Sequence, residues 1–178
     1  MRRLKLPPLL AMSALLTFCT PPPPPPAASS APPPPRPAPP PPAPLGWLDM
    51  PLTPGTWTYR AEGAMSVATF GASGAAQPLF IVRCDRQIRT ISLNNVLPAP
   101  GAQPATMKLT TTFGDGQWPA AAPDPAQPLL TVRLAAADPL LDKLAYSLGR
   151  FMIETSGMAT LILPAWPEVA RVIEDCRG

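Results

Sequence analysis

The sequence predicts a mainly β domain, a β-sandwich or distorted barrel of six to eight short strands with two short helices in its C-terminal half. Apolar and polar residues alternate repeatedly between residues 57 and 134, with glycine- or proline-rich turns between the alternating segments. Two later segments instead carry apolar residues at helical spacing behind a proline. We therefore divide the chain into a leader (residues 1–19), a proline-rich tether (residues 20–45) and one β-rich domain (residues 46–178).

The first strands follow from the alternation and from the turns between them. Trp57 occupies an apolar position of the first alternating segment, so we expect it in the core. Residues 78–84 are almost continuously apolar, which predicts a central strand buried on both faces. The Gly-Asp-Gly at residues 114–116 is expected to end a strand, and the proline- and alanine-rich residues 119–128 to form a loop. The expected strands of this half are residues 57–61, 66–70, 78–84, 87–93, 107–113 and 129–134.

A helix is predicted after the last of these strands. Asp138 is a good N-cap, Pro139 suits the first helical position and Gly149 suits the position just after the helix. Four leucines fall on one face of this helix and should point to the core: Leu140, Leu141, Leu144 and Leu148.

The C-terminal segment predicts a hairpin and a second helix. Residues 151–155 and 158–163 flank Ser156-Gly157, which is a turn signal. The helix begins at Pro167, and Trp166 is expected to anchor its start. Its apolar stripe has i, i+3, i+4, i+7 spacing and consists of Val169, Val172, Ile173 and Cys176.

Three cysteines divide between two roles. Cys19 ends the leader, which leaves Cys84 and Cys176 as a pair. Cys84 lies on the expected central strand and Cys176 on the buried face of the last helix, so we expect a disulfide between them in an oxidising compartment. A bridge over so long a loop would stabilise the fold by about 4–5 kcal/mol in the chain-entropy model.

The leader has the organisation of a secretory signal. Three basic residues precede an apolar run at residues 6–18, which is too short to span a bilayer as a helix. The end of this run, Leu16-Thr17-Phe18-Cys19, resembles the bacterial lipoprotein signal, in which the chain is cut before a cysteine that is then lipidated; Phe18 stands where a small residue is usual. The resemblance implies that Cys19 anchors the chain in a lipid bilayer. An uncleaved or differently cleaved leader is the alternative.

Thr20 follows Cys19 where an aspartate would retain an enterobacterial lipoprotein at the inner membrane. The resemblance therefore implies an exported protein anchored in the outer membrane and facing the periplasm, with inner-membrane anchoring as the alternative.

The tether contains 16 prolines between Pro21 and Pro44. Proline lacks an amide donor and has a fixed φ, so this segment is expected to form extended polyproline II helix and to reach about 75 Å. We interpret it as a spacer; the alternative is a ligand for an aromatic-lined groove.

Charge and composition exclude several functions. The net charge of +3 arises from basic residues of the leader and tether, and residues 46–178 carry 10 basic and 11 acidic side chains. A nearly neutral domain offers no broad electrostatic footprint for nucleic acid. The chain has no histidine, which excludes catalysis by an imidazole base, and its cysteines lack metal-binding spacing. We expect no metal, no cofactor and no nucleic-acid partner.

Candidate catalytic groups have simpler structural explanations. Asp138 can cap a helix, and Glu168 lies in a first helical turn, where the helix dipole favours a carboxylate. Ser147 and Lys143 are four residues apart on a helix, a spacing that an exposed face explains without a Ser–Lys pair. We therefore assign no catalytic residue and predict a protein that is not an enzyme; a carboxylate-based glycan hydrolase is the alternative.

Candidate binding residues come from two groups. Arg83, Arg86 and Arg89 surround Cys84 and could form an anion site. Trp47 and Trp118 lie in loop-like surroundings and could offer a binding surface, together with a small-residue loop at residues 72–75.

The tail from Phe151 to Cys176, together with residues 78–84, is similar in arrangement to the invasion-associated locus B family of alphaproteobacterial periplasmic proteins. The resemblance covers residues 55–176, implies an immunoglobulin-like sandwich and carries over no functional residue. We expect a lipid-anchored envelope protein with a non-catalytic interaction domain, whose partner is an envelope protein or a cell-wall glycan. The alternative is a periplasmic inhibitor or a module that binds a small ligand or glycan.

Overall fold

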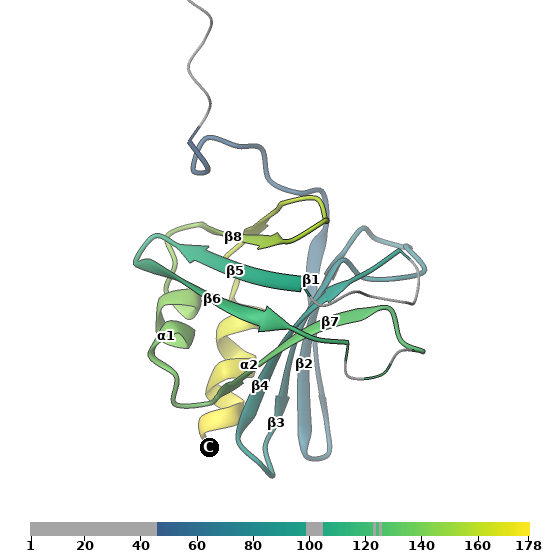
Figure 1. The fold of residues 1–178 in the computed structure, drawn as a ribbon. Coiled ribbons are helices and arrows are strands. Elements are labelled where there is room, and N and C mark those ends of the chain that lie inside the picture. Colours follow the sequence, from purple (N-terminus) through teal and green to yellow (C-terminus); the bar gives the residue numbers. More distant parts are fainter. Residues whose placement is uncertain (1–45, 99–104, 123, 125) are drawn as a thin grey trace, which may run out of the picture. The chain divides into compact units, whose positions relative to one another are not determined.

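A computed structural model describes residues 46–98, 105–122, 124 and 126–178. The predicted leader and tether, including Cys19, lie outside the described residues. Within the described part, nine strands form two antiparallel sheets that do not close into a barrel, and two helices lie in the C-terminal half (Figure 1). The mainly β fold class is thus as predicted. The elements are β1 (Thr56–Glu62), β2 (Met65–Gly71), β3 (Phe80–Asp85), β4 (Thr90–Val96), β5 (Ala105–Thr111), β6 (Gly114–Ala120), β7 (Leu129–Ala135), α1 (Pro139–Ala145), β8 (Arg150–Thr155), β9 (Leu161–Pro164) and α2 (Pro167–Arg177).

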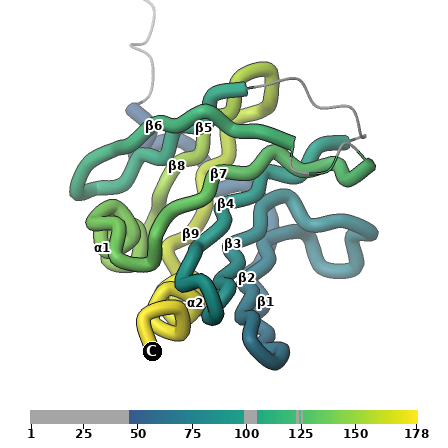
Figure 2. Tube along the Cα trace, turned by 60° about the horizontal axis from the view of Figure 1, so that its bottom comes forward, coloured from purple at the N-terminus to yellow at the C-terminus, as the bar shows by residue number. Residues whose placement is uncertain are grey.

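The first sheet has five strands in the order β1-β2-β3-β4-β7, and the second has four in the order β6-β5-β8-β9. The chain builds β1 to β4 as consecutive hairpins, moves to the second sheet for β5 and β6, and returns for β7 (Figure 2). The β1–β2 turn pairs Glu62 with Met65, and its Gly63 has φ 55°, which the tight hairpin turn favours.

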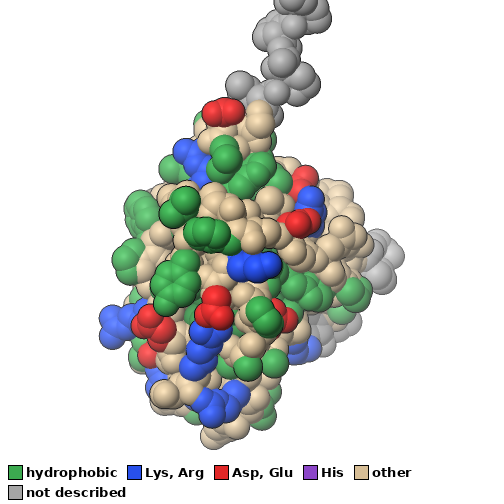
Figure 3. Space-filling view, turned by 90° about the vertical axis from the view of Figure 1, so that its left-hand side faces the viewer, with side chains coloured by type: hydrophobic (Ala, Val, Ile, Leu, Met, Phe, Trp, Pro, Cys, Tyr) green, Lys and Arg blue, Asp and Glu red, His purple; other side chains and the backbone are tan. Residues whose placement is uncertain are grey.

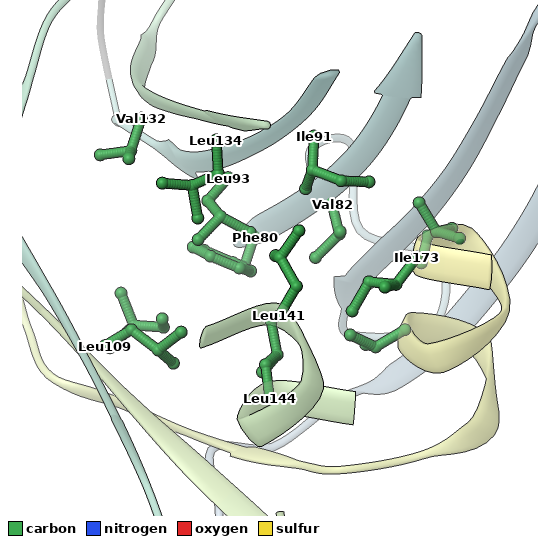
Figure 4. Close-up of a cluster of buried hydrophobic side chains, with 14 of the residues drawn as sticks. Phe80, Val82, Ile91, Leu93, Leu109, Val132, Leu134, Leu141, Leu144 and Ile173 are labelled. Atoms are coloured by element: carbon green, nitrogen blue, oxygen red, sulfur yellow. The ribbon is translucent and has the colours of Figure 1, made fainter. Parts of the chain in front are cut away.

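The core lies between the inner faces of the sheets and against both helices. Phe80 and Val82 of β3, with Leu109 of β5, are fully buried there. Leu141 of α1 and Ile173 of α2 point into the same cluster (Figure 4). Since α2 contacts β1, β2, β3 and β4, the inner face of the five-stranded sheet is covered partly by the second sheet and partly by this helix.

Strand β6 occupies residues for which the sequence predicted a turn and a loop. Gly114 to Gly116 pair with Leu109 to Thr111 of β5, so these glycines belong to the ladder. A Cβ at Gly116 would lie 2.6 Å from the Trp118 ring and 2.8 Å from Leu140. Gly116 is therefore a strand glycine that lets these side chains approach the backbone.

The expectation that β3 is buried on both faces is wrong. Phe80, Val82 and Cys84 face the core, but Ile81 is half-buried and Arg83 is exposed. The outer face of the sheet is open at Arg83, so a central strand can carry a charge there.

Helix α1 begins as predicted and ends earlier. The Asp138 carboxylate accepts the Leu140 amide at 2.9 Å, and the helix ends at Ala145, with Tyr146 as its C-cap. Leu148 is 70% exposed and does not join the apolar face, while Gly149, with φ 75°, lies in the turn before β8. The chain leaves the helix because the Ser147 hydroxyl donates to the Arg150 carbonyl oxygen and accepts the Thr112 amide.

Helix α2 has the predicted buried stripe, and its Cys176 is joined to Cys84 of β3. Trp57 is buried as expected, and its indole donates to the Pro164 carbonyl oxygen at 2.9 Å. Thr53, just before β1, pairs with Ile162 of β9 through two hydrogen bonds of 2.8 and 2.9 Å. No helix within the described ranges has the length and apolar character needed to cross a membrane.

Candidate functional site

The side chains of the three arginines around Cys84 lie in three different places. Arg83 points outward from β3. Arg86 lies 3.5 Å from the Asp175 carboxylate, and Arg89 donates to the Cys176 carbonyl oxygen. The predicted anion site at this cluster is therefore not assembled as a group.

The two candidate tryptophans are half-buried. Trp118 of β6 packs against the hydrophobic core and over Gly116, so it contributes to packing more than to a surface. Trp47 lies in the turn at residues 46–49 that precedes β1. Neither side chain forms the wall of a hollow described below.

A groove with a volume of about 650 Å³ lies on the outer face of the five-stranded sheet. We call it the outer groove. The outward side chains of β1, β2 and β3 form its floor, and residues 72–78 between β2 and β3 form one wall. The small-residue loop at 72–75 predicted as a binding surface is part of this wall, and Arg83 is part of the floor. Its lining residues are Thr56, Thr58, Arg60, Glu62, Val67, Thr69, Gly71, Ala72, Ser73, Gly74, Ala75, Gln77, Pro78 and Arg83.

The floor of the outer groove is polar because the strands alternate. β1 directs Trp57 inward and Thr58 and Arg60 outward. Across the β1–β2 ladder Thr58 is opposite Thr69, and the two hydroxyls share a hydrogen bond of 2.7 Å. The groove thus offers hydroxyl, amide and guanidinium groups, the carboxylate of Glu62, and no aromatic ring.

A second polar cluster lies between β1 and α2, on the inner face. The Tyr59 hydroxyl donates to the Asp175 carboxylate at 2.5 Å, and the Arg171 guanidinium lies 4.2 Å from the centre of the Tyr59 ring. Asp175 also pairs with Arg86. This cluster fixes α2 over the sheet beside the disulfide.

The cluster shifts the acidity of both bonded groups. Burial alone would raise the pKa of Asp175, but the hydrogen bond from Tyr59 and the charges of Arg86 and Arg171 outweigh it, so this pKa is lowered. The pKa of Tyr59 is raised, because the phenol donates to Asp175, is partly desolvated and faces a negative charge. Both shifts keep the pair in its bonded form at neutral pH.

The remaining candidate catalytic groups, apart from Glu168 and Glu174, have structural partners. Asp138 caps α1, and Asp142 pairs with Arg177. The Ser147 hydroxyl is bonded to backbone groups on both sides and makes no hydrogen bond to Lys143. Glu168 and Glu174 line a shallow hollow with Tyr59 and Arg171. Within the described ranges, no three acidic or cysteine side chains gather closely enough to hold a metal ion.

Exposed apolar side chains lie near the end of α1. Figure 3 shows the α1 side of the domain, on which hydrophobic and charged side chains are interspersed. Phe113, Tyr146 and Leu148 are exposed. The Leu148 amide donates a hydrogen bond to the hydroxyl of Thr112, the residue before Phe113, so the segments that carry Phe113 and Leu148 lie side by side.

In comparisons with known proteins, the sequence matches no family model and no curated protein, and no solved structure matches the chain.

The sequence alone missed two outward arginines of the five-stranded sheet, Arg60 and Arg133. Both lie at polar positions of alternating segments, which is a signal for an outward side chain. Only the strand order places them in line with Arg83.

Proposed function

We propose that this protein is a lipid-anchored component of the bacterial cell envelope, whose domain at residues 46–178 is a non-catalytic binding domain held off the membrane by a polyproline spacer. Lipidation at Cys19 attaches the chain to a bilayer, in the outer membrane facing the periplasm or, as the alternative, in the inner membrane. The partner is an envelope protein or a cell-wall glycan.

The outer groove carries the binding part of this proposal. It is an open groove of about 650 Å³, whose polar lining consists of hydroxyl, amide and guanidinium groups and the carboxylate of Glu62. Among the side chains considered for catalysis, Asp138 caps a helix, Asp142 forms an ion pair and Ser147 bonds to the backbone. Glu168 and Glu174 of α2 instead line a shallow hollow. A surface of this kind suits recognition of a polar partner.

The disulfide supports export. Cys84 and Cys176 lie in the core and are joined, a state that persists in oxidising compartments such as the periplasm. The signal-like leader and the cysteine at its end support a lipid anchor.

The anchor is tested by Cys19→Ala. The wild-type chain should incorporate labelled palmitate and sediment with outer-membrane vesicles on a density gradient, whereas the variant should incorporate none and leave the membrane fraction. Equal sedimentation of both chains without label would refute the anchor. Sedimentation of wild type with inner-membrane markers would select the alternative location.

The binding role is tested by chemical crosslinking in intact cells followed by purification of the protein. One partner recovered at a constant ratio, whether protein or glycan, supports the proposal. No crosslinked partner at any crosslinker length would contradict it.

A periplasmic inhibitor or glycan-binding module is a second candidate, because the same groove could receive a segment of another molecule. An inhibitor should copurify with one enzyme and reduce its activity. A glycan-binding module should instead be released from envelopes by glycan-degrading enzymes.

A further inference from the structure

The ladders of the five-stranded sheet place three arginines in one row across its outer face. Arg60 of β1 pairs with Val67, Val67 pairs with Arg83 of β3, Arg83 pairs with Ser92, and Ser92 pairs with Arg133 of β7. Alternate strands therefore each contribute one arginine at the same level. We call these three residues the arginine row.

The arginine row is exposed and has no partner within the described part of the chain. Arg60, Arg83 and Arg133 are all exposed. None of the ion pairs or side-chain hydrogen bonds among the described residues involves them; the paired bases are Arg86, Lys108 and Arg177. Since neighbouring strands are about 4.8 Å apart, successive members of the row are separated by about 10 Å at the backbone.

The surroundings of the row are electrostatically asymmetric. On one side of the row, two residues away along each strand, the outward positions include Glu62 of β1 and Asp85 of β3. Asp85 already accepts the backbone amides of Gln87 and Ile88. In the other direction lie the uncharged Thr58 and Thr69. The outer groove includes both sides, because Glu62 lines it as well as Thr58 and Thr69, so an anion that contacts the row is favoured at the threonine end of the groove.

Arg60 and Arg83 line the groove, and the row continues beyond it to Arg133. Guanidinium groups bind carboxylate in a bidentate geometry, and hydroxyl and amide groups exchange hydrogen bonds with sugar hydroxyls. The repeated spacing fits a linear polymer with regularly placed anionic groups better than it fits one small anion.

We propose that the outer groove and the arginine row bind a linear acidic glycan whose carboxylate groups contact successive arginines. This inference rests on the proposed binding function and specifies its partner. The near-neutral charge of the whole domain does not oppose it, because three arginines without an ion pair among the described residues lie in one row on the outer face.

The test uses the full chain in a neutral detergent and a fluorescent oligogalacturonide as the carboxylated probe. Binding is measured by anisotropy at low salt and at 0.15 M salt. A double variant, Arg60→Gln with Arg83→Gln, removes two members of the row. A matched variant, Arg89→Gln with Lys143→Gln, removes the same charge elsewhere.

The row variant should bind about tenfold more weakly, a loss of about 1.4 kcal/mol for two exposed contacts, and the matched variant should bind within about twofold of wild type. Binding should weaken as salt is raised. Circular dichroism and thermal unfolding must show that both variants are folded as wild type.

Several results would overturn the inference: equal losses in both variants, equal binding of neutral dextran, or a preference for single-stranded DNA or for phosphatidylglycerol vesicles. Failure of wild type to bind oligogalacturonide would also overturn it. The crosslinking experiment remains separate, because recovery of a protein partner there would retain the binding function while rejecting the glycan.

Discussion

Replacing both Cys84 and Cys176 with alanine is expected to lower the free energy of unfolding by about 4–5 kcal/mol. The disulfide joins residues separated by 92 positions. In the chain-entropy model a closed loop of this length removes about 4.6 kcal/mol of conformational freedom from the unfolded chain at 25 °C. This is a large fraction of the 5–15 kcal/mol or so that a domain usually has.

Urea unfolding followed by tryptophan fluorescence measures the change. With a slope of about 2 kcal/mol per molar urea, the midpoint should fall by about 2 M. Unfolding of the wild-type chain in reductant is a second measurement. Reductant breaks the disulfide but leaves both cysteine side chains in place, so it separates the effect of the link from the loss of the sulfur atoms. Cys19→Ala is the control and should leave the midpoint unchanged. A loss below about 1 kcal/mol in both arms would refute the reasoning that the link acts by constraining the unfolded chain.

Three further predictions concern side chains described above. Asp175→Asn should lower the free energy of unfolding at pH 7. The difference from wild type should shrink as the pH falls below about 4, because the folded-state pKa of Asp175 is lowered and its contribution is lost on protonation. Urea titrations that give the same difference at pH 3 and pH 7 would contradict this. Gly116→Ala should cost about 1–3 kcal/mol, since its methyl group would overlap the Trp118 ring; a midpoint equal to wild type would show that the ring has room to move. Asp138→Ala should cost about 1 kcal/mol by removing the cap of α1, measured in the same way, and an unchanged value would mean that the cap is dispensable.

Alternation could predict which side of a strand faces the core, because it depends only on the strand itself. Alternation predicts Trp57 inward for this reason, and helical spacing likewise predicts Cys176 on the buried stripe of the last helix. Glycine is ambiguous in such patterns, because it can mark either a turn or a position inside a strand. Gly116 has the sequence character of a turn residue, and its role depends on the Trp118 and Leu140 side chains that approach it.

The candidate site could be predicted only in part. Arg83 and the loop at residues 72–75 were identified from the sequence, and both line the outer groove. The sequence grouped Arg83 with Arg86 and Arg89 because they are close along the chain. Its neighbours in space are set by strand order and register, which local patterns do not contain, so Arg60 and Arg133 could not be joined to it.

The disulfide also determines how the domain would respond to mechanical load. A force that pulls the two ends apart cannot extend the chain between Cys84 and Cys176, because the covalent link carries the tension past those residues. Only residues 46–83 and the last two residues can then be drawn out of the described domain, and the larger segment has an extended length of about 130 Å. Strands β4 to β9 would stay unstretched, and a pulled molecule would keep a covalently closed remnant from which to refold.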